Sequence, residues 1–129
     1  MVTSGENPAE RDSVVVKHLD ELEHPWPQWI LARKGLGVRS FGINVCELQP
    51  GEQITEHDET GRAQEEVFVT LAGNATLVVD GTETPMPEGT FARLDPEPRR
   101  YVVNHGNDVV HMLIVSAPVT SGYKPMDWA

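Results

Sequence analysis

His57 and the carboxylates around it are the residues of this chain best suited to chemistry. His57 lies in the acidic run EQITEHDETGRAQEE, which spans residues 52–66. A histidine near its ordinary pKa can take or give a proton at neutral pH, and imidazole and carboxylate groups together can bind a divalent cation. A run this acidic is also typical of a solvated loop. The run by itself therefore leaves a catalytic site, a metal site and a bare surface loop open.

The other residues with reactive side chains are scattered along the chain. His105 lies in the predicted turn 104–108, which places it on the surface. His111 lies in a strand that is apolar on both faces, where it is either a hydrogen-bonded core histidine or a ligand that enters a pocket. Cys46 is the one cysteine, so an intramolecular disulfide and a CxxC site are excluded, and we expect it to be inert packing. The three tryptophans, Trp26, Trp29 and Trp128, are predicted to be packing or interface aromatics.

The charge balance excludes two classes of partner. The 129 residues include 10 Lys and Arg against 20 Asp and Glu, which gives a net charge of −10. Nucleic acids and anionic membrane surfaces are bound through basic patches, and the basic residues here stand singly or in pairs. The polar start and the short apolar runs predict a soluble protein, and a lone cysteine fits the reducing cytoplasm.

Short apolar runs between glycines and prolines must position these residues. The chain has 11 Gly and 10 Pro, and the runs between them have the length of strands, roughly 4 to 8 residues. Asp80-Gly81 is the strongest turn signal, because this pair readily adopts the positive φ angles of a type I′ hairpin turn. The one window that could be helical, residues 20–34, is broken by Pro25 and Pro27. The predicted strands cover residues 14–16, 41–48, 67–71, 76–79, 90–94, 101–103 and 109–115.

These elements predict one all-β domain, a sandwich or a barrel. We assign residues 1–12 to a disordered N-terminal tail and residues 13–116 to the β-domain. Residues 117–129 are expected to form a C-terminal packing segment that is anchored by Tyr123 and Trp128.

Two stretches of the chain resemble the paired motifs of the cupin family. The first reads PGEQITEHDETGRAQEEVFVTLAGNATLVVDG from Pro50 onward. The first cupin motif runs Gly, five residues, His, one residue, His, three or four residues, Glu, six residues, Gly. Here its positions fall on Gly51, His57, Glu59, Glu66 and Gly73, with Glu59 in place of the second His and a longer loop before Glu66.

The second stretch, PEGTFARLDPEPRRYVVN, resembles the second cupin motif with more substitutions. That motif runs Gly, five residues, Pro, one residue, Gly, two residues, His, three residues, Asn. Counted from Gly89, its positions fall on Asp95, Glu97, Arg100 and Asn104, so that Arg100 stands in place of the His. The resemblance covers about residues 41–116 and implies a cupin barrel, the jelly roll or double-stranded β-helix, in a small single-domain bacterial cupin.

The alternation of side chains along strands predicts which residues face the pocket of such a barrel. Glu66 shares a face with Phe68, and Arg100 shares a face with Asn104, while Arg99 points to the other side. The metal-ligand face of a cupin points into the barrel. The resemblance therefore implies one inward-facing cluster of His57, Glu59, Glu66 and Arg100.

Cupins typically hold a divalent metal with three His and one Glu, and two of those His are replaced here. His57, Glu59 and Glu66 remain as a candidate set for Zn, Ni, Fe or Mn, and no other cofactor is expected. Arg100 is no ligand, because a guanidinium has no lone pair, and its charge opposes a metal ion. Arg100 either replaces the charge of the metal, by pairing with Glu66 or Glu59 or by binding an anionic ligand, or is a solvated partner of Asp95 or Glu97.

The preferred prediction is a binding protein that holds a small anionic molecule in its barrel, with a degenerate metal site. The alternative is a metal-free isomerase, epimerase or lyase with His57 as the base and Asp58 or Glu59 as its orienting partner. A metal-dependent oxygenase ranks third, because only one clear His is present, and a purely structural role ranks fourth. We also expect a homodimer in which the strand 14–16 covers a sheet edge. The expected ligand-binding residues are Arg100, Glu66, Phe68, Asn104 and His111.

Overall fold

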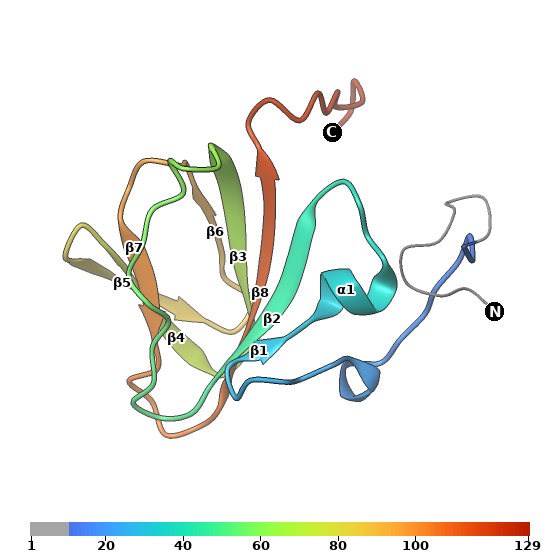
Figure 1. The fold of residues 1–129 in the computed structure, drawn as a ribbon. Coiled ribbons are helices and arrows are strands. Elements are labelled where there is room, and N and C mark those ends of the chain that lie inside the picture. Colours follow the sequence, from blue (N-terminus) through green and yellow to red (C-terminus); the bar gives the residue numbers. More distant parts are fainter. Residues whose placement is uncertain (1–10) are drawn as a thin grey trace.

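The computed structural model describes residues 11–129, and its strands form two antiparallel sheets that face each other (Figure 1). The larger sheet has the order β1-β2-β8-β3-β6, and the smaller has the order β5-β4-β7. The strands are β1 (Trp29–Ile30), β2 (Gly42–Leu48), β3 (Gln64–Ala72), β4 (Asn74–Val79), β5 (Thr82–Pro87), β6 (Phe91–Leu94), β7 (Arg100–Val103) and β8 (Val110–Pro118). The helical elements are a 3₁₀ helix, η2 (Leu19–Glu21), and one α-helical turn, α1 (Ala32–Leu36). None of the helices described is long and apolar enough to cross a membrane.

The predicted hairpin turn at Asp80-Gly81 is confirmed. Both residues have positive φ angles, 48° and 83°, and they join β4 directly to β5. β5 itself was not predicted, because its sequence TETPMP lacks an apolar run and contains two prolines. Proline is tolerated there because β5 is an edge strand, and only Met86 of β5 is buried.

Two terminal predictions are wrong. Residues 14–16 form no strand in the single chain, where their side chains are exposed, and their predicted contact with a second copy stays a prediction. Tyr123 and Trp128 are 78% and 83% exposed, so neither side chain anchors the C-terminal segment, which runs away from the sheets (Figure 1). Most of the tail predicted at residues 1–12 lies outside the described residues, and the domain boundaries remain predictions.

The helical window was predicted to be broken by prolines, and the structure has helices only on either side of them. η2 ends before Pro25, and α1 begins after Pro27 and was not predicted. α1 ends at Gly37, whose φ of 75° is left-handed and whose N–H donates to the carbonyl of Arg33 at 2.9 Å.

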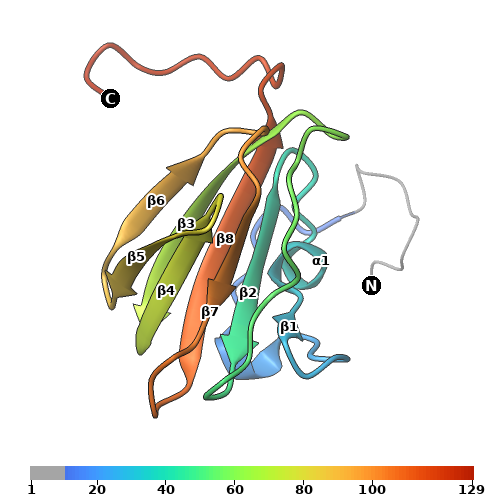
Figure 2. The ribbon, with the colours of Figure 1, turned by 90° about the vertical axis from the view of Figure 1, so that its left-hand side faces the viewer.

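The predicted alternation along β3 is confirmed. The inward-facing side chains of the larger sheet form one side of the space between the sheets, which we call the floor. Glu66, Phe68 and Thr70 are buried, while Val67 and Val69 face the outside of the larger sheet. Strand pairing places the inward residues of β2, β8 and β3 in two neighbouring rows, and Figure 2 shows these strands side by side. The first row is Gly42, Ser116 and Glu66, and the second is Asn44, Ile114 and Phe68.

Residues 51–57 extend the smaller sheet along the free side of β7. The N–H of Ile54 donates to the carbonyl of Val102 at 3.0 Å. The N–H of His57 donates to the carbonyl of Arg100 at 3.0 Å, and the N–H of Arg100 returns a bond of 2.8 Å. This pairing holds the backbone of His57 directly beside Arg100, opposite the floor on which Glu66 lies.

Candidate functional site

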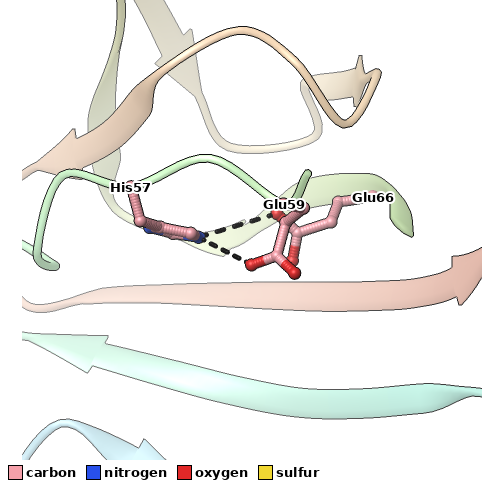
Figure 3. A group of neighbouring side chains, drawn as sticks. All are labelled: His57, Glu59 and Glu66. Atoms are coloured by element: carbon pink, nitrogen blue, oxygen red, sulfur yellow. Dashed lines mark ion pairs between the residues drawn. The ribbon is translucent and has the colours of Figure 1, made fainter. Parts of the chain in front are cut away.

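His57, Glu59 and Glu66 converge between the two sheets (Figure 3). Nε2 of His57 lies 3.1 Å from Oε2 of Glu59 and 3.9 Å from Oε1 of Glu66. One ligand atom from each of the three side chains falls within 4.8 Å of the others. The predicted convergence of these residues is confirmed, although they come from the 51–57 segment, the loop that follows it, and β3.

The backbone fixes the orientation of the His57 ring. Nδ1 lies 2.9 Å from the carbonyl oxygen of Thr55. A carbonyl only accepts hydrogen bonds, so Nδ1 carries a hydrogen and Nε2 is left facing the carboxylates. Nε2 of His57 thus lies 3.1 Å from Oε2 of Glu59, close enough for an ion pair when the imidazole is protonated, or for both atoms to bind one cation.

Each carboxylate is held by a neighbour through its Oε1 atom. Nε2 of Gln64 donates to Oε1 of Glu59 at 2.8 Å, and the N–H of Glu59 donates to the carbonyl of Pro96 at 2.9 Å. Oε1 of Glu66 accepts from Nη2 and Nε of Arg100 at 2.8 and 3.3 Å. Both acidic side chains are therefore placed before any ligand binds.

Arg100 pairs with Glu66, which was one of its predicted roles. It lies on the side of Glu66 away from the cavity. Its side chain has no exposed surface. Nη1 donates to the carbonyls of Asp95 and Pro98 at 3.0 and 2.7 Å, with that of Pro96 at 3.4 Å. The alternative of a solvated arginine is wrong, and a guanidinium enclosed by these acceptors does not present its charge to a ligand.

A cavity of about 270 Å³ opens in front of the cluster. Of the expected ligand-binding residues, Glu66 and Phe68 line it, and Arg100, Asn104 and His111 do not. The cavity is lined by Trp29, Gly42, Ile43, Asn44, Ile54, His57, Glu59, Glu66, Phe68, Ile114 and Ser116.

Asn104 and His111 have other partners. The amide of Asn104 is fully buried, donates to the carbonyls of Leu48 and Asp108, and accepts from the N–H of Gly106. Nε2 of His111 lies 2.9 Å from Oε2 of Glu47 on the outer face of the larger sheet. His111 is therefore neither a core histidine nor a pocket ligand, because the strand turns it away from the cavity.

Asp58 is not the orienting partner of His57. Its Oδ1 accepts from the hydroxyl and the N–H of Thr60 at 2.7 and 3.1 Å, and these two bonds lower the pKa of Asp58 below its ordinary value of 3.8. Asp58 also faces Arg99, which lies on the exposed side as predicted. The carbonyl of Thr55 and the carboxylate of Glu59 orient the ring instead.

Three polar or aromatic residues of the cavity were not predicted. Asn44 and Ser116 face inward by the same alternation that places Cys46 and Met112, so the strand pattern contained a signal for them. Trp29 lies in a two-residue strand, where no periodicity exists to indicate its direction. Cys46 is buried packing as predicted, and its burial, with smaller contributions from nearby glutamates, raises its pKa from 9.0 to about 12.

Comparisons with known proteins agree on the family. The family model of the Cupin domain matches residues 44–116. Similar solved structures include a sugar phosphate isomerase of the cupin superfamily from Silicibacter pomeroyi, which is 22% identical with a TM-score of 0.66 over 79% of this chain and 74% of that chain. A cupin protein from Bacteroides fragilis is 15% identical, with a TM-score of 0.69 over 86% and 93% of the two chains.

A Cupin 2 conserved barrel domain protein from Salinispora arenicola is 25% identical, with a TM-score of 0.62 over 85% of this chain and 93% of that chain. Among curated proteins there is no significant match. The family match covers more than half of the chain, and the two facing sheets have the architecture of these neighbours. The chain therefore belongs to the cupin superfamily and folds as a cupin β-barrel.

Proposed function

We propose that this cupin binds a small molecule in the cavity and moves a proton on it with His57 and Glu59. The observation that carries the proposal is the 3.1 Å approach of Nε2 of His57 to Oε2 of Glu59, at the wall of the cavity. An imidazole and a carboxylate side by side at a cavity can act as base and acid, one taking a proton from a bound molecule and the other giving one to it.

The pair supports isomerisation or epimerisation, because such reactions return every proton that they remove. In the form with His57 neutral and Glu59 protonated, Nε2 of His57 takes a proton from carbon, and Glu59 delivers its own to an adjacent atom of the substrate. The two groups then exchange roles to complete the turnover, so no other reactant is needed. The neighbour from Silicibacter pomeroyi is named as a sugar phosphate isomerase, which supports testing isomerisation first.

A divalent metal site on the same residues is the second candidate, favoured by the 4.8 Å grouping of three ligand atoms. His57, Glu59 and Glu66 would hold the ion, and one nitrogen with two carboxylates suits zinc, manganese, iron or nickel. A bound ion would act as a Lewis acid toward a substrate oxygen. Arg100 already neutralises one carboxylate at 2.8 Å, so we expect such an ion to be held weakly.

One experiment tests the proposal and separates the two candidates. The protein is dialysed against EDTA, and exchange of carbon-bound hydrogen is followed by NMR in D₂O with a panel of aldoses and ketoses. We expect the dialysed protein to stay folded and to catalyse exchange, and His57→Gln to lower the rate by roughly 100-fold or more. Asp58→Asn is the matched control, because Asp58 is turned away from His57 and should leave the rate unchanged.

Stoichiometric metal in the purified protein would favour the metal site over metal-free acid–base catalysis. The same holds if exchange is lost on dialysis and restored by zinc or manganese. A dialysed protein without exchange on any sugar of the panel would leave the acid–base proposal without support.

We also propose a homodimer, formed through the outer face of the larger sheet. Phe91 of β6 is 72% exposed there, and Leu71 of β3 is 46% exposed. Apolar patches of this kind are typical of protein interfaces. The same face carries the partly buried side chains of Val67, Val69, Leu113 and Val115.

A further inference from the structure

We propose that the cavity selects a ligand rich in hydrogen-bond donors, uncharged or cationic, and that Asn44 on β2 is a specificity-determining residue for it. The inference rests on the proposed function, because it concerns the ligand of the same cavity. It reverses the prediction of an anionic ligand, and the reversal follows from where the charges lie.

The groups that face the cavity are mostly acceptors of hydrogen bonds. Glu59 and Glu66 contribute carboxylates, and none of the lining residues is Lys or Arg within the part of the chain that the structure describes. Arg100 is sealed behind Glu66 by carbonyl acceptors. A phosphate or carboxylate would meet two negative side chains with no free guanidinium, whereas hydroxyl or ammonium groups would meet acceptors.

Asn44 carries a polar atom that the protein leaves without a partner. Its Oδ1 is buried and forms no hydrogen bond among the described residues. Its neighbours in the same row of the floor, Ile114 and Phe68, are apolar and offer no donor. A buried acceptor without a partner is unfavourable and uncommon, so its retention at a cavity wall needs an explanation.

A ligand hydroxyl can supply the missing donor. Asn44 lines the cavity, and the amide torsion χ2 is broad, so rotation about χ2 can offer Oδ1 to a bound molecule. Asn44 lies on β2, while His57 and Glu59 lie on the opposite wall of the cavity. A ligand between the two walls can therefore contact polar side chains on both sides.

Two further features of the wall fit the same class of ligand. Gly42 has no side chain, and a Cβ atom there would collide with Oγ of Ser116, so the glycine leaves room for this hydroxyl beside Glu66. Trp29 pairs with Cys46 on the inner face and adds an aromatic wall. An indole surface packs well against the C–H faces of a polyol and also attracts cations.

The test compares D-ribose with D-ribose 5-phosphate as probes, by ligand-observed NMR and by the change in Trp fluorescence. We expect the wild type to bind ribose more tightly than its phosphate. Asn44→Leu keeps the branched shape of the side chain but removes the acceptor, and should weaken ribose binding by roughly 3- to 10-fold. Asn44→Asp keeps an acceptor and should retain ribose binding.

Thermal unfolding separates recognition from a structural role. Removing an unsatisfied buried amide should raise the unfolding temperature of Asn44→Leu by roughly 3 to 6 °C, although ribose binds it less well. Asn107→Leu, on an exposed loop, is the control and should change neither binding nor the unfolding temperature.

Tighter binding of the phosphate, no binding of ribose by the wild type, or unchanged ribose affinity in Asn44→Leu would each overturn the inference. Failure of the proposed function looks different. If the wild type catalyses no exchange while ribose still binds in an Asn44-dependent manner, the acid–base assignment fails and the ligand class stands.

Discussion

Arg100 shows how one substitution changes the chemistry of a cupin pocket. Where the family motif has a metal-ligating His, this chain has a cation that pairs with Glu66 at 2.8 Å across the space between the sheets. The charge that a metal would bring is thus partly supplied by the chain itself. Because the guanidinium also donates to the carbonyls of Asp95 and Pro98, it ties the 95–98 loop to the site.

Removing Arg100 should therefore destabilise the fold strongly. Arg100→Met leaves the Glu66 carboxylate buried without a partner, and we expect a loss of about 3 to 5 kcal/mol in the free energy of unfolding. Urea titration measures it. Arg100→Lys should restore only part of this loss, because an ammonium has three donors and cannot reach carboxylate and carbonyls in the geometry of a guanidinium.

The double variant Arg100→Met, Glu66→Met provides the control. Replacing a buried ion pair by apolar side chains is often close to neutral, so the double variant should be clearly more stable than Arg100→Met alone. If Arg100→Met and wild type unfold at the same urea concentration, the pair contributes nothing and our account of Arg100 is wrong.

At the scale of elements, the junction of β3 and β4 explains why the first motif ends in glycine. Gly73 has a φ of 82°, a left-handed conformation, and a Cβ built on it would lie 2.6 Å from the carbonyl oxygen of Val109. The chain passes this close because β3 pairs with β8, which begins at Val110. The glycine is needed both for the turn and for the approach of two backbones.

Gly73→Ala should consequently cost more than an ordinary glycine substitution. Gly81 has nearly the same φ, 83°, but a Cβ there would have nothing within 4 Å. Gly81→Ala therefore measures backbone strain alone, about 1 to 2 kcal/mol. We expect Gly73→Ala to lose at least about 1 kcal/mol more in chemical denaturation, because the backbone must shift. Equal losses for the two variants would mean that the turn accommodates the methyl group.

At the scale of the molecule, several large apolar side chains of the described residues are exposed. They include Phe91 on the outer face of the larger sheet, and Tyr123 and Trp128 in the C-terminal segment. For a chain with a net charge of −10, repulsion between copies opposes association, so a dimer must gain its stability from apolar contact.

Sedimentation equilibrium at micromolar concentration should therefore give about twice the 14.3 kDa of the chain. Phe91→Glu should shift the equilibrium to the monomer, because it places a charge in the apolar face. Val16→Glu is the control, since Val16 is exposed but forms no strand. A wild-type mass of one chain would contradict the dimer, and dissociation by Val16→Glu alone would move the interface to residues 14–16.

Much of the barrel and part of the site were determined by the sequence itself. Strand alternation placed Glu66 and Phe68 on the inner face, and the motif spacing placed His57, Glu59 and Glu66 together. Asp80-Gly81 predicted its turn. These features depend on local stereochemistry, namely the two-residue period of a strand and the φ angles open to glycine, which any short stretch of the chain carries.

Only the tertiary structure decided what each inward side chain meets. Arg100 faces inward as its register predicts, but the carbonyls of the 95–98 loop and the carboxylate of Glu66 enclose it. It therefore holds Glu66 and this loop in place and does not contact a ligand. Trp29 reaches the cavity because β1 pairs with β2, while Tyr123 and Trp128 find no surface to cover. Burial and hydrogen bonding depend on residues distant in the chain, so their outcome is settled only when the sheets have come together.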